Sequence, residues 1–217
     1  MIKDFFKCEP AASRMSGDER RSQILQLAIT LFSQRGFNGT TTKEIAKAAG
    51  ISEAMVFRHF ATKNELYDAI LDYKACHNDQ ALPWEENSVI NQAIERNDDY
   101  AVFYNLALNA LNKHQDDPDF MRLLLHSALE EHTLSDKFFE EFVVRIYEFI
   151  GDFITKRQQD GVMREVEPKI VVRAFLGMII HHSLNNILWD KTQRLLSISN
   201  EDTAKNFAEI LLRGVIK

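Results

Sequence analysis

The chain is poor in the residues that interrupt helices, since its 217 residues include only 4 Pro and 8 Gly. All-β folds and Rossmann-type folds need frequent Gly and Pro at their turns, so this scarcity argues against both. Long stretches are instead rich in Leu, Ile, Ala, Glu, Lys and Arg, which favour helices. The composition therefore predicts an all-α protein.

Cysteines and long apolar runs are also scarce. The 2 cysteines, Cys8 and Cys76, form neither a CxxC pair nor a zinc ligand set, and free thiols suit a reducing cytosol. No run of 18 apolar residues predicts a membrane-spanning helix. The charges of Lys3, Asp4 and Lys7 argue against a signal peptide. We expect a cytoplasmic protein with no metal, no cofactor and no membrane partner.

The net charge of −6 at first disfavours a nucleic-acid partner, but the charge is unevenly distributed. Residues 1–70 hold ten Lys or Arg against eight Asp or Glu, whereas the remainder holds sixteen against twenty-four. A mildly basic N-terminal part can therefore meet phosphates. The sequence shows no HExxH, Glu-x-x-His, GxSxG or Gly-rich phosphate-loop motif, which disfavours an enzyme.

The segment from Thr42 to Phe60 has the features of a helix-turn-helix. Two short helices flank residues 49–52, where Gly50 permits a tight turn and Ser52 can cap the second helix. Such a motif presents its second helix to the major groove of DNA. Helices are predicted over 18–35, 42–49, 53–60, 62–75, 85–113, 119–132, 135–160, 168–190 and 200–215. The expected domains are a flexible arm (1–17), a helix-turn-helix domain (18–66) and a helical effector and dimerisation domain (67–217).

This segment and its surroundings strongly resemble the TetR family of bacterial regulators. The motifs that carry the resemblance are TKEIAKAAGIS (42–52), VFRHF (56–60) and TKNEL (62–66). Outside about 20–70, only helix number, helix lengths and the closing 211–214 agree. The resemblance implies a homodimer that places its third helix in the major groove and binds a ligand in its C-terminal domain.

The resemblance also suggests which side chains contact DNA. Thr42, Lys63 and His59 look like phosphate contacts, although His59 can instead be a packing residue. Arg58 is the candidate for a bidentate contact to guanine, with phosphate or solvent as the alternatives. The side chains expected to face the groove are Ser52, Glu53, Ala54, Met55 and Arg58.

Several of these positions leave two interpretations open. Lys43, like Lys47 four residues later, is either a solvated charge or a phosphate contact. Glu53 either caps its helix or accepts a hydrogen bond from cytosine. Phe57 stands where the family most often has Tyr and so lacks a hydroxyl for phosphate, and Ala54 replaces a frequent Gly.

The C-terminal part carries broad, Phe-rich apolar faces at helical spacing. They form either a plain bundle core or the wall of a ligand cavity between helices. The residues expected to line a ligand site are Phe103, Tyr104, His126, Phe149, Asn185 and Trp189. The segment 168–190 is apolar almost all round, so it must be buried on more than one side.

Together with the last helix, this segment is expected to pair with its symmetry mate, as the family does. The residues expected in this dimer interface are Phe175, Ile179, His182, Phe207 and Leu211.

The predicted function is a ligand-responsive transcription repressor that holds a palindromic operator in double-stranded DNA. A small, largely apolar effector would release it. Transcriptional activation is one alternative, because it uses the same DNA-binding geometry. The other is a DNA-binding adaptor that contacts a protein partner and no small ligand. A closed bundle without a cavity, or an exposed apolar patch, would favour this adaptor.

Overall fold

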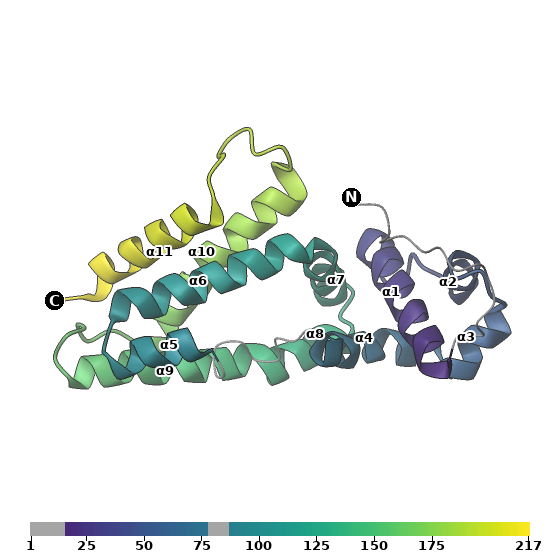
Figure 1. Cartoon of the computed structure of the whole chain (residues 1–217), viewed down its shortest axis with the longest axis horizontal. Helices are drawn as coiled ribbons and strands as arrows, with labels where there is room; N and C mark the ends of the chain where they lie inside the picture. Colours follow the sequence, from purple (N-terminus) through teal and green to yellow (C-terminus); the bar gives the residue numbers. More distant parts are fainter. Residues whose placement is uncertain (1–15, 78–86) are drawn as a thin grey trace, which may run out of the picture.

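The computed structural model describes residues 16–77 and 87–217, which fold into an elongated arrangement of helices (Figure 1). One end holds α1 (Gly17–Arg35), α2 (Thr42–Ala48) and α3 (Glu53–His59), and α4 (Lys63–His77) leads away from them. Helices α7 (Pro118–Leu129) and α8 (Thr133–Phe138) lie in the middle. The other end holds α5 (Ser88–Glu95), α6 (Asp99–Asp116), α9 (Val144–Gln159), α10 (Pro168–Leu184) and α11 (Asn200–Val215). Two π-helical turns, η1 (Phe139–Val143) and η2 (Asn185–Trp189), continue α8 and α10.

The prediction of an all-α fold is confirmed. Within 16–77 and 87–217 the only strand-like pairing is an isolated bridge between Met163 and Ile216. None of the helices in these ranges is long and apolar enough to cross a membrane. Most predicted helices lie within a few residues of their observed bounds, because the amphipathic spacing and the caps were both present in the sequence.

One helix prediction is wrong, since the helix expected over 85–113 is two helices, α5 and α6. The chain breaks at Asn97, which adopts a left-handed φ of 54°. Asp98 then caps α6 by accepting a hydrogen bond from the backbone of Ala101. Asn tolerates the left-handed region and Asp is a favoured N-cap, so these two side chains stop one helix and start the next.

Some sequence predictions fall outside the described residues. They include most of the expected flexible arm, residues 1–15, which contains Cys8. They also include the break at Pro83 and the side chain of Cys76. Helix α1 already begins at Gly17, because Ser16 forms a reciprocal capping box with Glu19.

The N-terminal helices do not form a closed core by themselves. Their apolar cluster, which extends from Ile24 to Ile70, also contains Leu123 of α7 and Leu134 of α8, both fully buried. Because Tyr67 and Ile70 of α4 belong to the same cluster, it extends past the predicted domain boundary at residue 66. The helix-turn-helix end therefore shares its core with the middle of the molecule.

The C-terminal helices enclose a second apolar core with a buried ion pair at its edge. Phe103 packs edge-on against Phe153 and Phe175, with ring centroids 6.0 and 5.2 Å apart. At the start of α6, the Asp99 carboxylate accepts from Nε and Nη2 of Arg157, at 2.7 and 3.1 Å. This two-point contact ties α6 to the end of α9, and both side chains are about nine-tenths buried.

We expect Asp99→Ala to lower the free energy of unfolding by about 3–5 kcal/mol, because it leaves the buried guanidinium without its main partner. Urea unfolding followed by circular dichroism measures the change. Asp160→Ala is the matched control, since it removes the more exposed partner of the same guanidinium, and should cost about 0–1 kcal/mol. Equal losses for the two variants would contradict the assignment of Asp99 as the main partner.

His114 of α6 is partly buried against α10, where its Nδ1 is 2.9 Å from the hydroxyl of Ser183. Burial, assisted by the positive charge of Lys113, lowers the pKa of His114 from 6.5 to about 4. Between these two pH values the unfolded chain binds a proton that the folded chain does not. The stability of the fold must therefore decrease as the pH falls from 6.5 towards 4.

Replacing His114 by Gln should flatten this part of the pH dependence, because Gln does not titrate and can keep a hydrogen bond to Ser183. The contribution lost by the wild type over the interval is at most about 3 kcal/mol. Urea unfolding at pH 6.5 and pH 4.5 gives the comparison, with the exposed His181→Gln as control. A His114→Gln variant with an unchanged pH profile would show that His114 titrates normally.

Candidate nucleic-acid interface

Helices α2 and α3 are joined by a tight turn whose geometry matches the prediction in outline. Gly50 adopts a φ of +66°, and the Ile51 backbone N–H donates to the carbonyl of Ala46 at 3.0 Å. The N-cap of α2 is Thr41, which forms a capping box with Glu44. Thr42 is consequently the first residue of α2.

Helix α3 is anchored from one side and exposed on the other. Val56 and Phe60 are buried in the N-terminal cluster, and Ser52 caps the helix by accepting from the Met55 backbone. The opposite face presents predicted DNA contacts to solvent. Ser52, Ala54, Phe57 and Arg58 are exposed, whereas Glu53, Met55 and His59 are partly buried. Lys43 and Lys47 of α2 are also exposed.

Two of the predicted contacts are hydrogen-bonded to each other. The Thr42 hydroxyl donates to the Glu53 carboxylate at 2.5 Å, which joins α2 to α3. A hydroxyl has one proton to donate, so in this arrangement Thr42 can offer a phosphate only its backbone N–H. Glu53 thereby has a function in positioning the two helices that neither sequence interpretation included.

Lys63 forms hydrogen bonds within the protein that the sequence did not indicate. Its ammonium donates to the carbonyls of Phe37 and Thr40, at 2.7 and 2.8 Å, and lies 4.0 Å from the centre of the Phe37 ring. Burial lowers its pKa, and the nearby Glu130 carboxylate partly opposes this effect. Lys63 therefore holds the loop between α1 and α2 with two of its three N–H groups. A contact between its third N–H and a DNA phosphate stays a prediction.

Sequence reasoning missed Glu130 at this loop. Its carboxylate accepts from the backbone N–H groups of Phe37 and Asn38, at 2.7 and 3.2 Å. More than ninety residues separate the partners in the chain, and no sequence pattern links a glutamate at the end of one helix to a distant loop.

The six predicted ligand residues do not gather around one hollow. Phe103 is fully buried in the C-terminal core, Tyr104 stacks on Tyr100, and Trp189 is 70% exposed. His126 and Phe149 are partly buried, and Asn185 bonds to His181 one helical turn earlier. Their role as ligand contacts remains a prediction.

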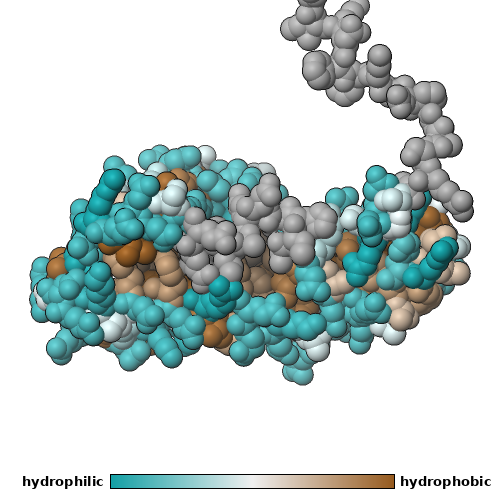
Figure 2. Space-filling view, turned by 60° about the horizontal axis from the view of Figure 1, so that its bottom comes forward, coloured by the Kyte–Doolittle hydropathy of each residue, from teal (hydrophilic) through white to brown (hydrophobic). Residues whose placement is uncertain are grey.

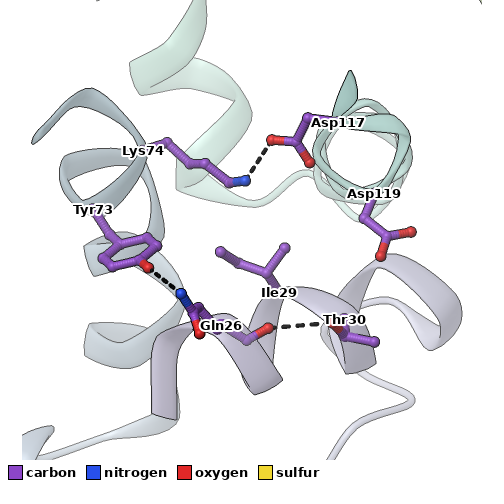
Figure 3. Close-up of a pocket in the computed structure, with 7 residues that line it drawn as sticks. All are labelled: Gln26, Ile29, Thr30, Tyr73, Lys74, Asp117 and Asp119. Atoms are coloured by element: carbon purple, nitrogen blue, oxygen red, sulfur yellow. Dashed lines mark hydrogen bonds and ion pairs between the residues drawn. The ribbon is translucent and has the colours of Figure 1, made fainter. Parts of the chain in front are cut away.

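Two hollows lie elsewhere and have mainly polar walls. The first, about 290 Å³, lies between α1, α4 and the start of α7 (Figure 3). Lys74 pairs with Asp117 on one side of it, and Gln26 donates to the Tyr73 hydroxyl at 2.8 Å on the other. The second, about 510 Å³, is lined by residues of α6, of the loop before α11 and of the first turn of α11, namely Asn112, Gln115, Gln193, Ser197, Ile198, Ser199, Asn200 and Glu201.

Three of the five predicted interface residues leave little surface for a second copy, and their role in a dimer stays a prediction. Phe175, Ile179 and Leu211 are buried within the chain itself. The reason is that α10 and α11 use their most apolar faces to pack in the C-terminal core. His182 and Phe207 are partly buried and contact each other, with ring centroids 5.8 Å apart.

The surface of α10 and α11 nevertheless retains apolar and small residues. Ile170 and Ile180 of α10 and Ile210 of α11 are 60, 42 and 60% exposed. Gly177 and Gly214 are exposed on the same helices and have open space where a side chain would be. In the view of Figure 2, hydrophilic residues cover most of the surface and hydrophobic ones form separate patches.

Comparison with known proteins gives matches of two kinds. The sequence profile of the bacterial regulatory proteins of the tetR family matches residues 24–70. The repressor KstR2 of Rhodococcus jostii is 43% identical over 63 residues, which are 29% of this chain and 31% of KstR2. The matched part thus spans less than a third of that relative's length.

Other matches extend over most of the chain at lower identity. The nucleoid occlusion factor SlmA of Vibrio campbellii is 28% identical over 173 residues, covering 78% of this chain and 84% of SlmA. The solved structure of AibR in complex with isovaleryl coenzyme A and operator DNA has a TM-score of 0.63 at 22% identity. It covers 89% of this chain and 98% of AibR, which establishes a common fold.

The matched profile covers most of α1, all of α2 and α3 and the first half of α4, and the remaining helices follow the same fold as the solved relatives. Residues 24–70 thus match the tetR family of bacterial regulatory proteins, and the chain as a whole shares the fold of the solved relatives.

Proposed function

We propose that the protein is a homodimeric repressor that binds a palindromic operator through α3 and is not an enzyme. The observation that carries the proposal is the exposed face of α3, which presents Arg58 and Phe57 at the end of the molecule, supported from below by buried Val56 and Phe60. The exposed Lys43 and Lys47 add positive charge beside it. Cations around an exposed recognition helix are what phosphate contacts and groove insertion require.

A dimer is proposed because a palindrome needs two recognition helices about one DNA turn apart. The exposed stripe on α10 and α11, with Ile170, Ile180 and Ile210, supplies apolar area away from α3. The two exposed glycines in it, Gly177 and Gly214, let helices approach closely. A two-fold axis through this stripe makes one surface serve both partners.

Release by a small, largely apolar effector is the finer part of the proposal. It is supported by the likeness to AibR, whose structure holds both an acyl coenzyme A and operator DNA. Because both hollows are lined mostly by polar residues, the proposed site of an apolar effector is the space between the helices of the C-terminal bundle, near the Phe-rich core. Binding there changes DNA affinity only if the effector favours one of two conformations.

A DNA-binding adaptor with a protein partner is the second candidate. Leu129 and Phe139 are 84 and 53% exposed near the junction of α7, α8 and η1, away from the proposed dimer stripe. The alignment with SlmA, named as a nucleoid occlusion factor, extends over most of the chain. Cytoplasmic localisation is proposed for either candidate, because both act on DNA.

The first test is selection of genomic DNA fragments on purified protein, followed by footprinting. We expect one protected palindrome near a promoter, and a mass in solution of twice the chain. Protein that has been unfolded, stripped of any bound small molecule and refolded serves as the comparison. If folded, stripped protein enriches no sequence, the DNA-binding proposal is wrong.

Arg58 and Lys43 should affect DNA binding in different ways. Arg58→Ala should remove the preference at one base position, at a cost of about 1–3 kcal/mol on the operator and little on other DNA. Lys43→Ala should weaken binding to all sequences alike and reduce the slope of log affinity against log salt by about one unit.

Fluorescence titrations at several salt concentrations, with the operator and its single-base variants, separate these effects. The exposed Lys205→Ala on α11 is the control for a lost surface charge. Uniform loss on every sequence for Arg58→Ala would remove its role in reading a base.

A further inference from the structure

The Glu130 side chain connects the helical body to the loop that precedes α2. Glu130 follows the last residue of α7, and its two carboxylate oxygens accept from two consecutive backbone N–H groups, Phe37 at 2.7 Å and Asn38 at 3.2 Å. Neither N–H is part of a helix ladder, because both lie between α1 and α2. Hydrogen bonds to a charged group are among the stronger ones in proteins.

The loop is shaped to receive this carboxylate. Gly36 ends α1 with a φ of +70°, and a Cβ built on it would lie 2.6 Å from Oε1 of Glu130. The carboxylate therefore occupies the space that any other residue at position 36 would need. Glycine here satisfies both the left-handed backbone and the close approach of Glu130.

The carbonyl groups of the same loop are bound by a second charged side chain, Lys63. Lys63 donates to the carbonyls of Phe37 and Thr40, while Glu130 binds the N–H of Phe37, so both polar groups of that residue are fixed. The buried Thr40 hydroxyl closes the loop by donating to the Gly36 carbonyl at 3.0 Å. The positive and negative side chains also offset each other's charge.

The turn that carries Glu130 is itself attached to the N-terminal helices. The His132 ring lies against the Phe37 and Tyr67 rings, with centroids 4.5 and 4.4 Å apart. Thr133 donates to Asp68 of α4 at 2.8 Å. The turn between α7 and α8 thus contacts the loop before α2 and the side of α4 together.

The loop leads without a break into Thr41, the N-cap of α2, and α2 is bonded to α3 through Thr42 and Glu53. We propose that Glu130 is a positioning residue that fixes α2 and α3 relative to the helical body. In the dimer it would thereby set the separation of the two recognition helices. This inference rests on the proposed function, since the spacing of the two α3 helices matters only if the dimer binds a palindromic operator.

The test uses Glu130→Gln, which keeps the shape but replaces one of the two accepting oxygens by an amide NH2 group, and Glu130→Ala, which removes both bonds. Glu140→Gln makes the same chemical change on an exposed glutamate of η1 and is the matched control. Circular dichroism and thermal unfolding establish that each variant is folded before it is compared.

The first measurement is amide hydrogen exchange at Phe37 and Asn38 in the protein without DNA. We expect exchange about tenfold faster in Glu130→Gln, faster still in Glu130→Ala, and unchanged in Glu140→Gln. Unchanged protection in both Glu130 variants would overturn the inference, because the carboxylate would not be holding the loop.

The second measurement is affinity for the operator and for versions with one base pair inserted or removed between the half-sites. The wild type should bind the natural half-site spacing more tightly than the altered ones. In the Glu130 variants this ratio of affinities should fall about tenfold, while affinity for a single half-site should be unchanged. A purely structural role would weaken all three DNAs equally and would overturn the inference. Wild-type protein that binds no operator would instead overturn the proposed function.

Discussion

The arrangement of this protein depends on the apolar core that its N-terminal helices cannot complete alone. Helices α1 to α4 leave one side of this core open, and Leu123 of α7 and Leu134 of α8 close it. A unit of this size buries too little surface to be stable by a wide margin. Burial of these two leucines therefore fixes the helix-turn-helix against the middle of the chain, and the polar contacts are built around that packing.

Polar contacts fix the orientation of the N-terminal helices on α7 and α8, which apolar packing alone does not define. Apolar contact tolerates small rotations, whereas two hydrogen bonds to one carboxylate do not. Glu130, Lys63 and His132 surround the loop between α1 and α2, and Thr42 and Glu53 extend the connection to α3. Base recognition requires such precision, because a displaced recognition helix loses its hydrogen bonds to base edges.

The sequence was sufficient for local structure and insufficient for contacts between distant segments. Helix positions, the turn at Gly50 and the exposed side of α3 follow from spacing and caps that lie within a few residues. The break at Asn97 depends on a left-handed residue followed by a new N-cap at Asp98, two features that the helical spacing of apolar residues does not report. The buried side of α10 does not follow from the sequence, since apolar residues lie on most sides of the helix, and the structure places Phe175 and Ile179 in the core of the chain itself. Lys63 was assigned to phosphate, because nothing in its neighbourhood reveals the carbonyls that it meets.

The shared core has a consequence for the modularity of this fold. The segment that resembles its relatives, residues 24–70, looks like a separable cassette in the sequence, yet two of its packing partners come from α7 and α8. Grafting residues 24–70 onto the C-terminal domain of another regulator would transfer the helix-turn-helix without the α7 and α8 residues that it packs against. A chimaera with a chosen operator specificity should therefore carry along Leu123, Glu130, His132 and Leu134, or an equivalent set already matched to the incoming loop.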